Sequence, residues 1–271
     1  MATVLKLGGE LLEDASAIAA SAAAIVRLAK REPLVVVHGG GRAIDADLKV
    51  RGLTPRFVDG LRVTDSAALD SVVSVLAGQT NTGLVAAIGA RGARAVGLTG
   101  ADAKIGLAVK AAPLATIKGE RVDLGLVGEP GGGDIALLTD LLKLGYVPVI
   151  ASVGVAADGT LLNVNADVFA AHLAAALGAR RLIVAGTTAG VLDGAGATIA
   201  ELTEADVQAL TASGTAHSGM VAKLNACRHA LGSGVGEVAI VAGRGVEDFD
   251  NAVGTRMLTG VLKTPVPQRG M

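Results

Sequence analysis

Short apolar runs alternate with longer segments of helical spacing along this chain of 271 residues. The runs are rich in Val, Ile and Leu, as the buried strands of a parallel sheet are. We predict strands at residues 3–7, 34–38, 94–98, 147–151, 181–185 and 237–241. We predict helices at residues 15–30, 41–51, 66–91, 134–144, 166–177, 204–212 and 219–231. This alternation predicts an α/β protein, a three-layer αβα sandwich with an open, mainly parallel central sheet.

Residues 105–128 break this alternation. Pro113 and the Lys118-Gly119 pair divide the segment into short pieces, which predicts an antiparallel hairpin that extends from the sheet and covers a ligand. The chain contains no internal repeat and no Pro/Ser-rich linker. We therefore expect two lobes of one continuous sheet, residues 1–178 and 179–271, divided near Gly178.

Composition excludes several classes of protein. The net charge of −1 provides no basic field for nucleic acid, and the aromatic content of 1% provides few stacking platforms for single strands. Cys227 is the single cysteine and the 4 histidines are scattered, so we expect no disulfide and no metal ligands. The sequence has neither a signal peptide nor an uninterrupted apolar run of membrane-spanning length. We expect a cytoplasmic protein that binds neither nucleic acid nor membrane.

Two glycine-rich turns follow predicted strands, Gly8-Gly9 and Gly39-Gly40-Gly41. Ligands of open parallel sheets bind beyond the carboxyl ends of the strands, and glycine lets backbone N–H groups approach an anion closely. The second turn also opens a helix, whose N-terminal N–H groups favour an anion. Either turn alone is explained equally well as a tight connection between a strand and a helix. The P-loop pattern and the dinucleotide-binding fingerprint are both absent, which argues against a dinucleotide-dependent oxidoreductase.

Charged and amide side chains accompany these turns. Lys6 lies in an otherwise apolar strand, where a lysine either reaches solvent or meets an anion. Lys223 follows Ser218 by five residues, and helical side chains tilt toward the helix N-terminus, so its ammonium group would reach the same anion. Asn165 suits a helix N-cap, a role that does not account for Asp167.

Arg62 offers a planar fork for a carboxylate, although a surface salt bridge is the alternative. The sequence contains no convincing Ser/His/Asp or Cys/His nucleophile set. Cations without a nucleophile favour phosphoryl transfer to a carboxylate, which is already ionised at neutral pH because the pKa of free Glu is about 4.3. Two like charges 4 Å apart repel by about 4 kcal/mol at an effective dielectric constant of 20. Fixed cations and N–H donors are therefore the expected catalytic groups.

The chain resembles the N-acetyl-L-glutamate kinases of the amino-acid kinase superfamily along nearly its whole length. The stretches that carry the resemblance are LKLGGELL, LVVVHGGG, FVDGLRVTD, AVGLTG, DLGLVGEP, GYVPVIASVGV, LLNVNAD, GVLDG, SGMVAKLNA and GTRM. The resemblance implies a fold of the amino-acid kinase type. It also implies phosphorylation of the side-chain carboxylate of N-acetyl-L-glutamate by ATP, with Mg²⁺ carried by the nucleotide, in arginine biosynthesis.

The resemblance also implies a role for each matching residue. Lys6 and Lys223 would stabilise the transferring phosphoryl group, and Asp167 would hold both lysines in place. The substrate-binding residues would be Gly40, Gly41, Arg62 and Asn163. The nucleotide-binding residues would be Gly9, Thr187, Thr188, Ala189, Gly190, Val191, Leu192, Thr215, Ala216 and His217. Residues 1–178 would form the acyl-amino-acid-binding lobe with the dimer contacts, residues 179–271 the nucleotide-binding lobe, and the hairpin a lid.

The chain departs from the family pattern at Thr187, where an acidic residue usually stands. The sequence does not say whether a water, Thr188 or another acidic residue compensates for this change in nucleotide binding. Because the first predicted strand begins at residue 3, the chain resembles the arginine-insensitive, homodimeric members, and we expect the long helix at residues 66–91 to form the dimer contact. Two alternatives stay open: a kinase for acetylated aminoadipate or glutamate, and a non-catalytic, nucleotide-binding regulatory homologue.

Overall fold

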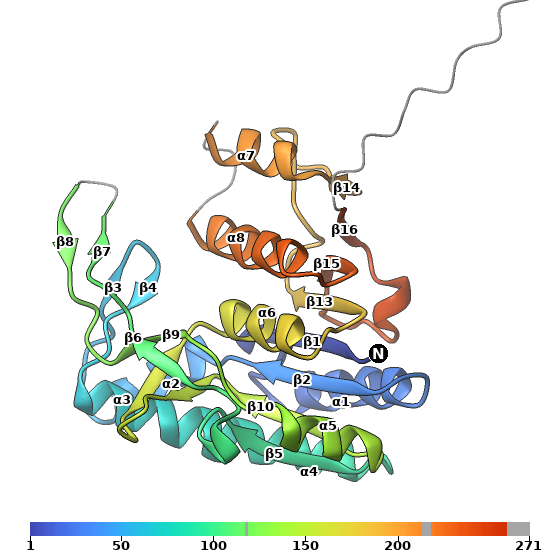
Figure 1. Cartoon of the computed structure of the whole chain (residues 1–271), viewed down its shortest axis with the longest axis horizontal. Coiled ribbons are helices and arrows are strands. Elements are labelled where there is room, and N and C mark those ends of the chain that lie inside the picture. Colours follow the sequence, from blue (N-terminus) through green and yellow to red (C-terminus); the bar gives the residue numbers. More distant parts are fainter. Residues whose placement is uncertain (117–118, 213–217, 259–271) are drawn as a thin grey trace, which may run out of the picture.

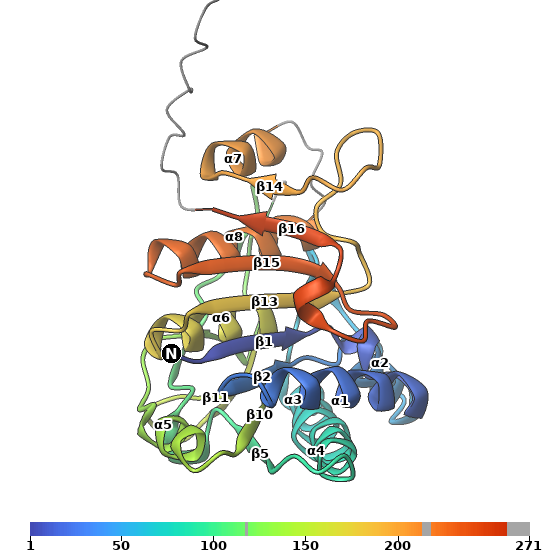
Figure 2. The same ribbon diagram turned by 90° about the vertical axis from the view of Figure 1, so that its right-hand side faces the viewer.

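A computed structural model describes residues 1–116, 119–212 and 218–258 of the chain (Figure 1). Its central sheet has eight strands in the order β14-β16-β15-β13-β1-β2-β10-β5. Their bounds are β1 Thr3–Leu7, β2 Leu34–His38, β5 Ala95–Thr99, β10 Val147–Ala151, β13 Arg181–Gly186, β14 Glu201–Leu202, β15 Glu237–Ala242 and β16 Gly254–Met257. Neighbouring strands pair in parallel except β15 with β16. Figure 2 shows β16, β15, β13, β1 and β2 one below another.

Helices cover both faces of this sheet. On one face, α1 (Ala15–Ala29) and α4 (Asn81–Gly89) pack against each other and contribute to the same buried cluster as the strands. The other face carries α5 (Ala136–Lys143), α6 (Ala166–Ala176) and α8 (Ser218–Gly232), and α7 (Glu204–Ala212) packs against α8. The predicted three-layer αβα architecture with a mainly parallel sheet is therefore confirmed.

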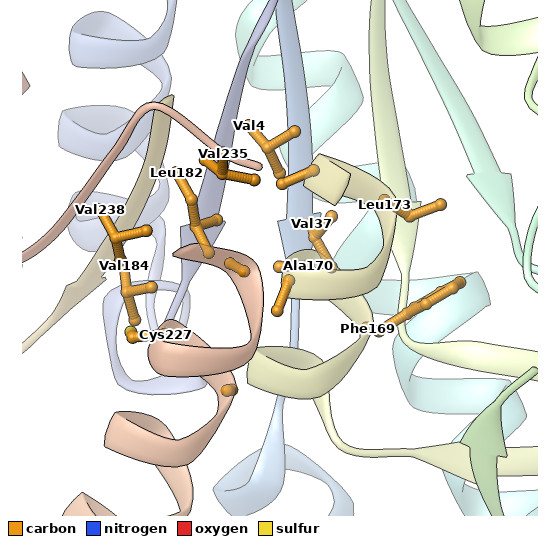
Figure 3. Close-up of a cluster of buried hydrophobic side chains, with 14 of the residues drawn as sticks. Val4, Val37, Phe169, Ala170, Leu173, Leu182, Val184, Cys227, Val235 and Val238 are labelled. Atoms are coloured by element: carbon orange, nitrogen blue, oxygen red, sulfur yellow. The ribbon is translucent and has the colours of Figure 1, made fainter. Parts of the chain in front are cut away.

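Successive side chains along each strand point to opposite faces of the sheet, so the strands contribute to two separate hydrophobic cores. In β1, Val4 points into the cluster beneath α6 and α8, whereas Leu5 and Leu7 point into the cluster beneath α1. Figure 3 shows the first cluster, in which Val4 and Leu182 of neighbouring strands lie near Ala170 of α6. Strands buried on both faces must be apolar at consecutive positions, which is why the sequence shows them as continuous runs.

A second, smaller structure lies beside the carboxyl ends of the central strands. Four strands form a sheet in the order β11-β12-β9-β6, with bounds Val153–Val155, Leu161–Val164, Val127–Pro130 and Ala108–Lys110. Two hairpins, β3–β4 (Phe57–Val58 and Leu61–Arg62) and β7–β8 (Leu114–Ala115 and Arg121–Val122), project beyond it. Figure 1 shows the hairpins next to each other, and Thr64 bridges to Gly125 between the segments that follow them.

The segment predicted to leave the sheet, residues 105–128, folds back on itself in antiparallel pairs, and β9 at its end also pairs in parallel with β12. Its first strand, β6, pairs antiparallel with β9, and the β7–β8 hairpin extends the excursion. The two remaining helices, α2 (Gly41–Val50) and α3 (Ser66–Val73), pack together near the carboxyl ends of β1 and β2. The site therefore has walls on several sides.

A π-helical segment, Ser74–Thr80, joins α3 to α4, so that Ser66–Gly89 forms one continuous helix. Judged by length and composition alone, this helix is long and apolar enough to cross a membrane. Polar residues such as Asp70, Gln79 and Asn81 interrupt its apolar residues, so the sequence shows no uninterrupted apolar run here. Val72, Leu76, Leu84 and Ile88 are fully buried against the rest of the molecule. Much of its apolar character is therefore used in packing, as in the core helix of a globular protein.

Candidate functional site

The two glycine turns pack directly on each other at the carboxyl ends of β1 and β2. A β-carbon on Gly9 would lie 2.7 Å from the Cα of Gly40, closer than real side chains approach a backbone. The Gly39 N–H also donates to the carbonyl of Leu7 at the end of β1. Only residues without side chains permit this approach. The turns thus form one continuous backbone surface rather than two separate connections.

A cluster of three charged side chains lies beside this surface. Asp167 Oδ1 is 2.9 Å from the Nζ of Lys6 on β1, and both Asp167 oxygens are 3.2 Å from the Nζ of Lys223 on α8. The side chains of Lys6, Asp167 and Lys223 are 9%, 12% and 16% exposed. Asn165 caps α6 by accepting from the N–H groups of Asp167 and Val168, which fixes the first turn that presents Asp167.

Burial and charge act against each other in this cluster. Burial raises the pKa of Asp167, but the ammonium groups of Lys6 and Lys223 outweigh this effect and hold the pKa below its usual value. Burial and the nearby charge of Lys6 lower the pKa of Lys223, although the carboxylate of Asp167 opposes them. Two buried cations share one carboxylate. The cluster therefore favours an additional anion.

A cavity of about 210 Å³ opens between the HGGG turn, the β3–β4 hairpin and the small sheet. It contains all four residues predicted to bind the acceptor. Its lining residues are Gly39, Gly40, Gly41, Ile44, Phe57, Gly60, Leu61, Arg62, Leu76, Val127, Ser152, Asn163, Val164, Asn165 and Ala166. We call it the acceptor cavity. The structure thus brings together Gly40, Gly41, Arg62 and Asn163, which come from distant parts of the sequence.

Arg62 is fixed in this cavity by three contacts. Its Nη1 lies 2.7 Å from Oδ1 of Asp45. The two atoms form an ion pair without the geometry of a hydrogen bond. Its Nη2 donates to the carbonyl of Gly41, and its guanidinium carbon lies 4.7 Å from the centre of the Phe57 ring. Asn163 is held in turn, because its Nδ2 donates to Oγ1 of Thr64. Both side chains are preorganised before any ligand enters.

A larger cavity, of about 610 Å³, lies between the segment that follows β13 and the first turns of α8, and it reaches Lys223. We call it the nucleotide cavity. Its lining residues are Glu10, Gly186, Thr187, Thr188, Gly190, Val191, Leu192, Asp193, Gly194, Gly196, Leu210, Gly219, Met220 and Lys223. Five of the predicted nucleotide-binding residues, Thr187, Thr188, Gly190, Val191 and Leu192, are among them.

Five other predicted nucleotide-binding residues are placed differently. Ala189 does not line the cavity; its carbonyl accepts a hydrogen bond from Thr198. Gly9 does not line it either and packs on Gly40 instead. Thr215, Ala216 and His217 lie outside the described residues. The sequence analysis missed Glu10 and Asp193, although each stands within three residues of a turn that it had already identified.

A third cavity, of about 360 Å³ and largely apolar, lies under the β7–β8 hairpin. Leu114 and Leu124 line it from the hairpin side, and Ala171 of α6 and Ala226 of α8 from the other. It meets the acceptor cavity at Leu61, Val127 and Asn165. In the described part of the chain, no group of three or more His, Cys, Asp or Glu side chains could hold a metal ion.

The chain matches a known family of proteins. Residues 1–242 match the family model described as the amino acid kinase family. The acetylglutamate kinase of Sphingopyxis alaskensis is 42% identical over 247 residues, 89% of this chain and 82% of that protein. The acetylglutamate kinase of Acidiphilium cryptum is 41% identical over 250 residues, with the same two shares.

Solved structures share the fold. The N-acetylglutamate synthase of Neisseria gonorrhoeae, solved with coenzyme A and N-acetyl-glutamate, superposes with a TM-score of 0.81 at 25% identity. The match covers 96% of this chain but only 59% of the synthase. A carbamate kinase from Giardia lamblia bound to AMP-PNP gives a TM-score of 0.64 at 16% identity, covering 96% of this chain and 98% of that one.

Proposed function

Because this chain belongs to the amino acid kinase family, we propose that it is an acetylglutamate kinase of arginine biosynthesis. It transfers the γ-phosphoryl group of ATP to the side-chain carboxylate of N-acetyl-L-glutamate. The observation that carries the proposal is the buried Lys6–Asp167–Lys223 cluster, which lies where the two glycine turns meet, with Lys223 lining the nucleotide cavity.

The chemistry suits this set of side chains. A carboxylate oxygen of the acceptor attacks the γ-phosphorus, the bond between that phosphorus and the β,γ-bridging oxygen breaks, and ADP leaves. The acceptor carboxylate is ionised at neutral pH and needs no base. Its approach to a polyphosphate is opposed by like charge, and Lys6 and Lys223 reduce that repulsion. Asp167 pairs with both ammonium groups and aims them at the same place.

The remaining residues bind and orient. Arg62 and Asn163 hold the α-carboxylate end of the acceptor, and the N–H groups of Gly40 and Gly41 bind the reacting carboxylate and phosphate. Thr187, Thr188, Gly190, Val191 and Leu192 contact the nucleotide, which carries Mg²⁺ into the site. The β7–β8 hairpin acts as a lid, supported by the apolar cavity beneath it. Residues 1–178 form the acceptor lobe and residues 179–271 the nucleotide lobe.

Trapping the acyl phosphate with hydroxylamine tests the proposal. ATP, Mg²⁺ and N-acetylglutamate should give the hydroxamate, and Lys223→Ala should lower the rate by about 10²-fold or more. Lys143→Ala is the matched control, because Lys143 is exposed and pairs with Asp140 on the same helix. Faster reaction with acetylated aminoadipate or with glutamate would reassign the acceptor. Nucleotide binding without transfer to any of these acids would identify a regulatory homologue.

The protein acts as a cytoplasmic homodimer that arginine does not inhibit. The proposed dimer contact is the continuous helix Ser66–Gly89, whose exposed face carries mainly small and polar residues such as Ala67, Ser74 and Gly78. Sedimentation velocity tests the dimer, and initial rates measured with and without added arginine test the absence of inhibition. A monomer, or inhibition by arginine, would contradict the corresponding part of this proposal.

A further inference from the structure

Glu10 follows the glycine turn after β1, and its side chain folds back over that turn. A β-carbon on Gly8 would lie 2.5 Å from Oε1 of Glu10, and one on Gly186 would lie 3.3 Å from the same atom. Gly8 directly follows β1 and Gly186 ends β13, the neighbouring strand. The carboxylate therefore lies over the carboxyl ends of both strands, where ligands of open sheets bind.

This carboxylate borders the nucleotide cavity without a partner. Glu10 lines the cavity together with Gly186 and Lys223. Among the residues that the structure describes, none forms a hydrogen bond or an ion pair with the Glu10 side chain. Glu13, three residues further along, differs in this respect, because Arg42 lies 3.1 Å from its carboxylate. Glu10 thus presents an unbalanced negative charge to the cavity.

An unbalanced carboxylate opposes the binding of a polyphosphate. Two charges of like sign at close range repel each other. A divalent cation between them turns this repulsion into attraction. Mg²⁺ in proteins is typically held by one or two carboxylates together with substrate phosphates and water. Lys223 does not neutralise Glu10, since its ammonium group is paired with Asp167.

We propose that Glu10 is a ligand, directly or through one coordinated water, of the Mg²⁺ ion that enters with ATP. The inference rests on the proposed function, because it requires a nucleotide in the cavity, and it assigns a protein side chain to the metal. Glu10 makes nucleotide affinity depend on Mg²⁺: without the ion its charge repels the phosphates, and with the ion it holds them.

Arg244 offers an alternative partner for the same carboxylate. Arg244 and Glu10 both line a neighbouring cavity of about 370 Å³, which Glu13 and Asp14 also border. If Arg244 turned toward Glu10, the arginine would neutralise the carboxylate without a metal ion. The variant Arg244→Gln distinguishes the two cases. With Glu10 bound to Mg²⁺, this variant keeps the Mg²⁺ dependence of the wild-type protein.

Calorimetry with ADP, in excess Mg²⁺ and in EDTA, measures this dependence without turnover. Glu10→Gln should weaken binding in Mg²⁺ by about tenfold or more and leave binding in EDTA unchanged or tighter. Glu10→Asp keeps the charge but shortens the side chain. Its affinity for ADP in Mg²⁺ should lie between those of the wild-type protein and Glu10→Gln. Glu13→Gln is the matched control and should behave as wild type. The electron paramagnetic resonance spectrum of Mn²⁺ in the ternary complex should show weaker metal binding in Glu10→Gln.

The outcomes separate this inference from the proposed function. If Glu10→Gln keeps the full Mg²⁺ dependence, or if Arg244→Gln increases it, Glu10 is not the metal ligand of the wild-type protein, although the kinase proposal stands. If the wild-type protein binds no ADP under either condition, the proposed function fails and the Glu10 assignment fails with it.

Discussion

Gly9 and Gly40 touch backbone to backbone, so that a β-carbon on Gly9 would lie 2.7 Å from the Cα of Gly40 and 3.0 Å from its nitrogen. Neither neighbouring atom belongs to a flexible side chain that could move aside. The contact fixes the spacing between the turn that follows Lys6 and the turn that borders the acceptor cavity. Both proposed substrates depend on that spacing.

Gly9→Ala should therefore separate the two turns. We expect a loss of stability of about 1–3 kcal/mol, as for other overpacked sites, together with a larger loss of kinase activity. Urea denaturation and the hydroxamate assay measure the two effects. Gly89→Ala at the end of α4 is the control, since a β-carbon there meets nothing within 4 Å. An active Gly9→Ala protein of normal stability would contradict the packing argument.

Asp167→Asn should lower the kinase activity while keeping a side chain of nearly the same size at this position. Burial and the charge of Lys6 both lower the pKa of Lys223, and the carboxylate of Asp167 is the group that opposes them. Without that carboxylate the pKa of Lys223 falls further. Activity that requires the ammonium form should then be lost at a lower pH on the alkaline side of the pH–rate profile.

The same variant should also be less stable, by about 3 kcal/mol, because two buried ammonium groups lose their shared partner. Asp167→Glu should restore part of the activity, since it returns the charge. An alkaline limb that does not move in Asp167→Asn would show that Asp167 does not control the charge of Lys223.

The central sheet could be predicted closely from the sequence. Strands 3–7, 34–38 and 147–151 are observed with the predicted bounds, strands 181–185 and 237–241 are one residue longer at the C-terminal end, and strand 94–98 is shifted by one residue to 95–99. Most of these strands are buried on both faces and are therefore apolar runs, whereas β5 lies at the edge of the sheet and is only partly buried. The edge strand β14 and its neighbour β16 have two and four residues. Segments so short carry no periodic pattern, and the sequence analysis missed them.

The candidate site could be predicted only in part, for a different reason. Lys6 and Lys223 lie near opposite ends of the chain, and their shared partner Asp167 follows from the resemblance rather than from spacing. Glu10 lies inside the LKLGGELL stretch, but the resemblance implied no role for its side chain. Its importance depends on how its side chain folds over Gly8, which only coordinates reveal.

Arg62→Lys should raise KM for N-acetylglutamate by about tenfold with a smaller change in kcat. A lysine cannot offer a planar fork to a carboxylate, and it would lose the stacking on Phe57. Steady-state rates at varied acceptor concentration test this split. Arg51→Lys is the control, because Arg51 is exposed and pairs with Asp47 on the outside of α2. An unchanged KM in Arg62→Lys would remove Arg62 from the acceptor site.

His38 should make the stability of the fold depend on pH. It is fully buried at the end of β2, and burial lowers its pKa from 6.5 to about 4, although a hydrogen bond to the Gly39 carbonyl opposes this change. Its Nε2 lies 3.1 Å from Nδ2 of Asn81, a donor, which suits a neutral ring with its proton on Nδ1. A protonated ring would set two donors against each other.

The lowered pKa fixes the direction of the effect. Above pH 6.5 the ring is neutral in both the folded and the unfolded chain, and its contribution to stability is fully present. As the pH falls from 6.5 to about 4, His38 binds a proton in the unfolded chain but not in the folded one, so stability falls. The shift corresponds to about 3 kcal/mol. Urea midpoints across this range should decline in the wild-type protein and in the control His229→Gln, whose imidazole is exposed. His38→Gln should flatten the decline, and an equally steep decline in His38→Gln would mean that other groups cause it.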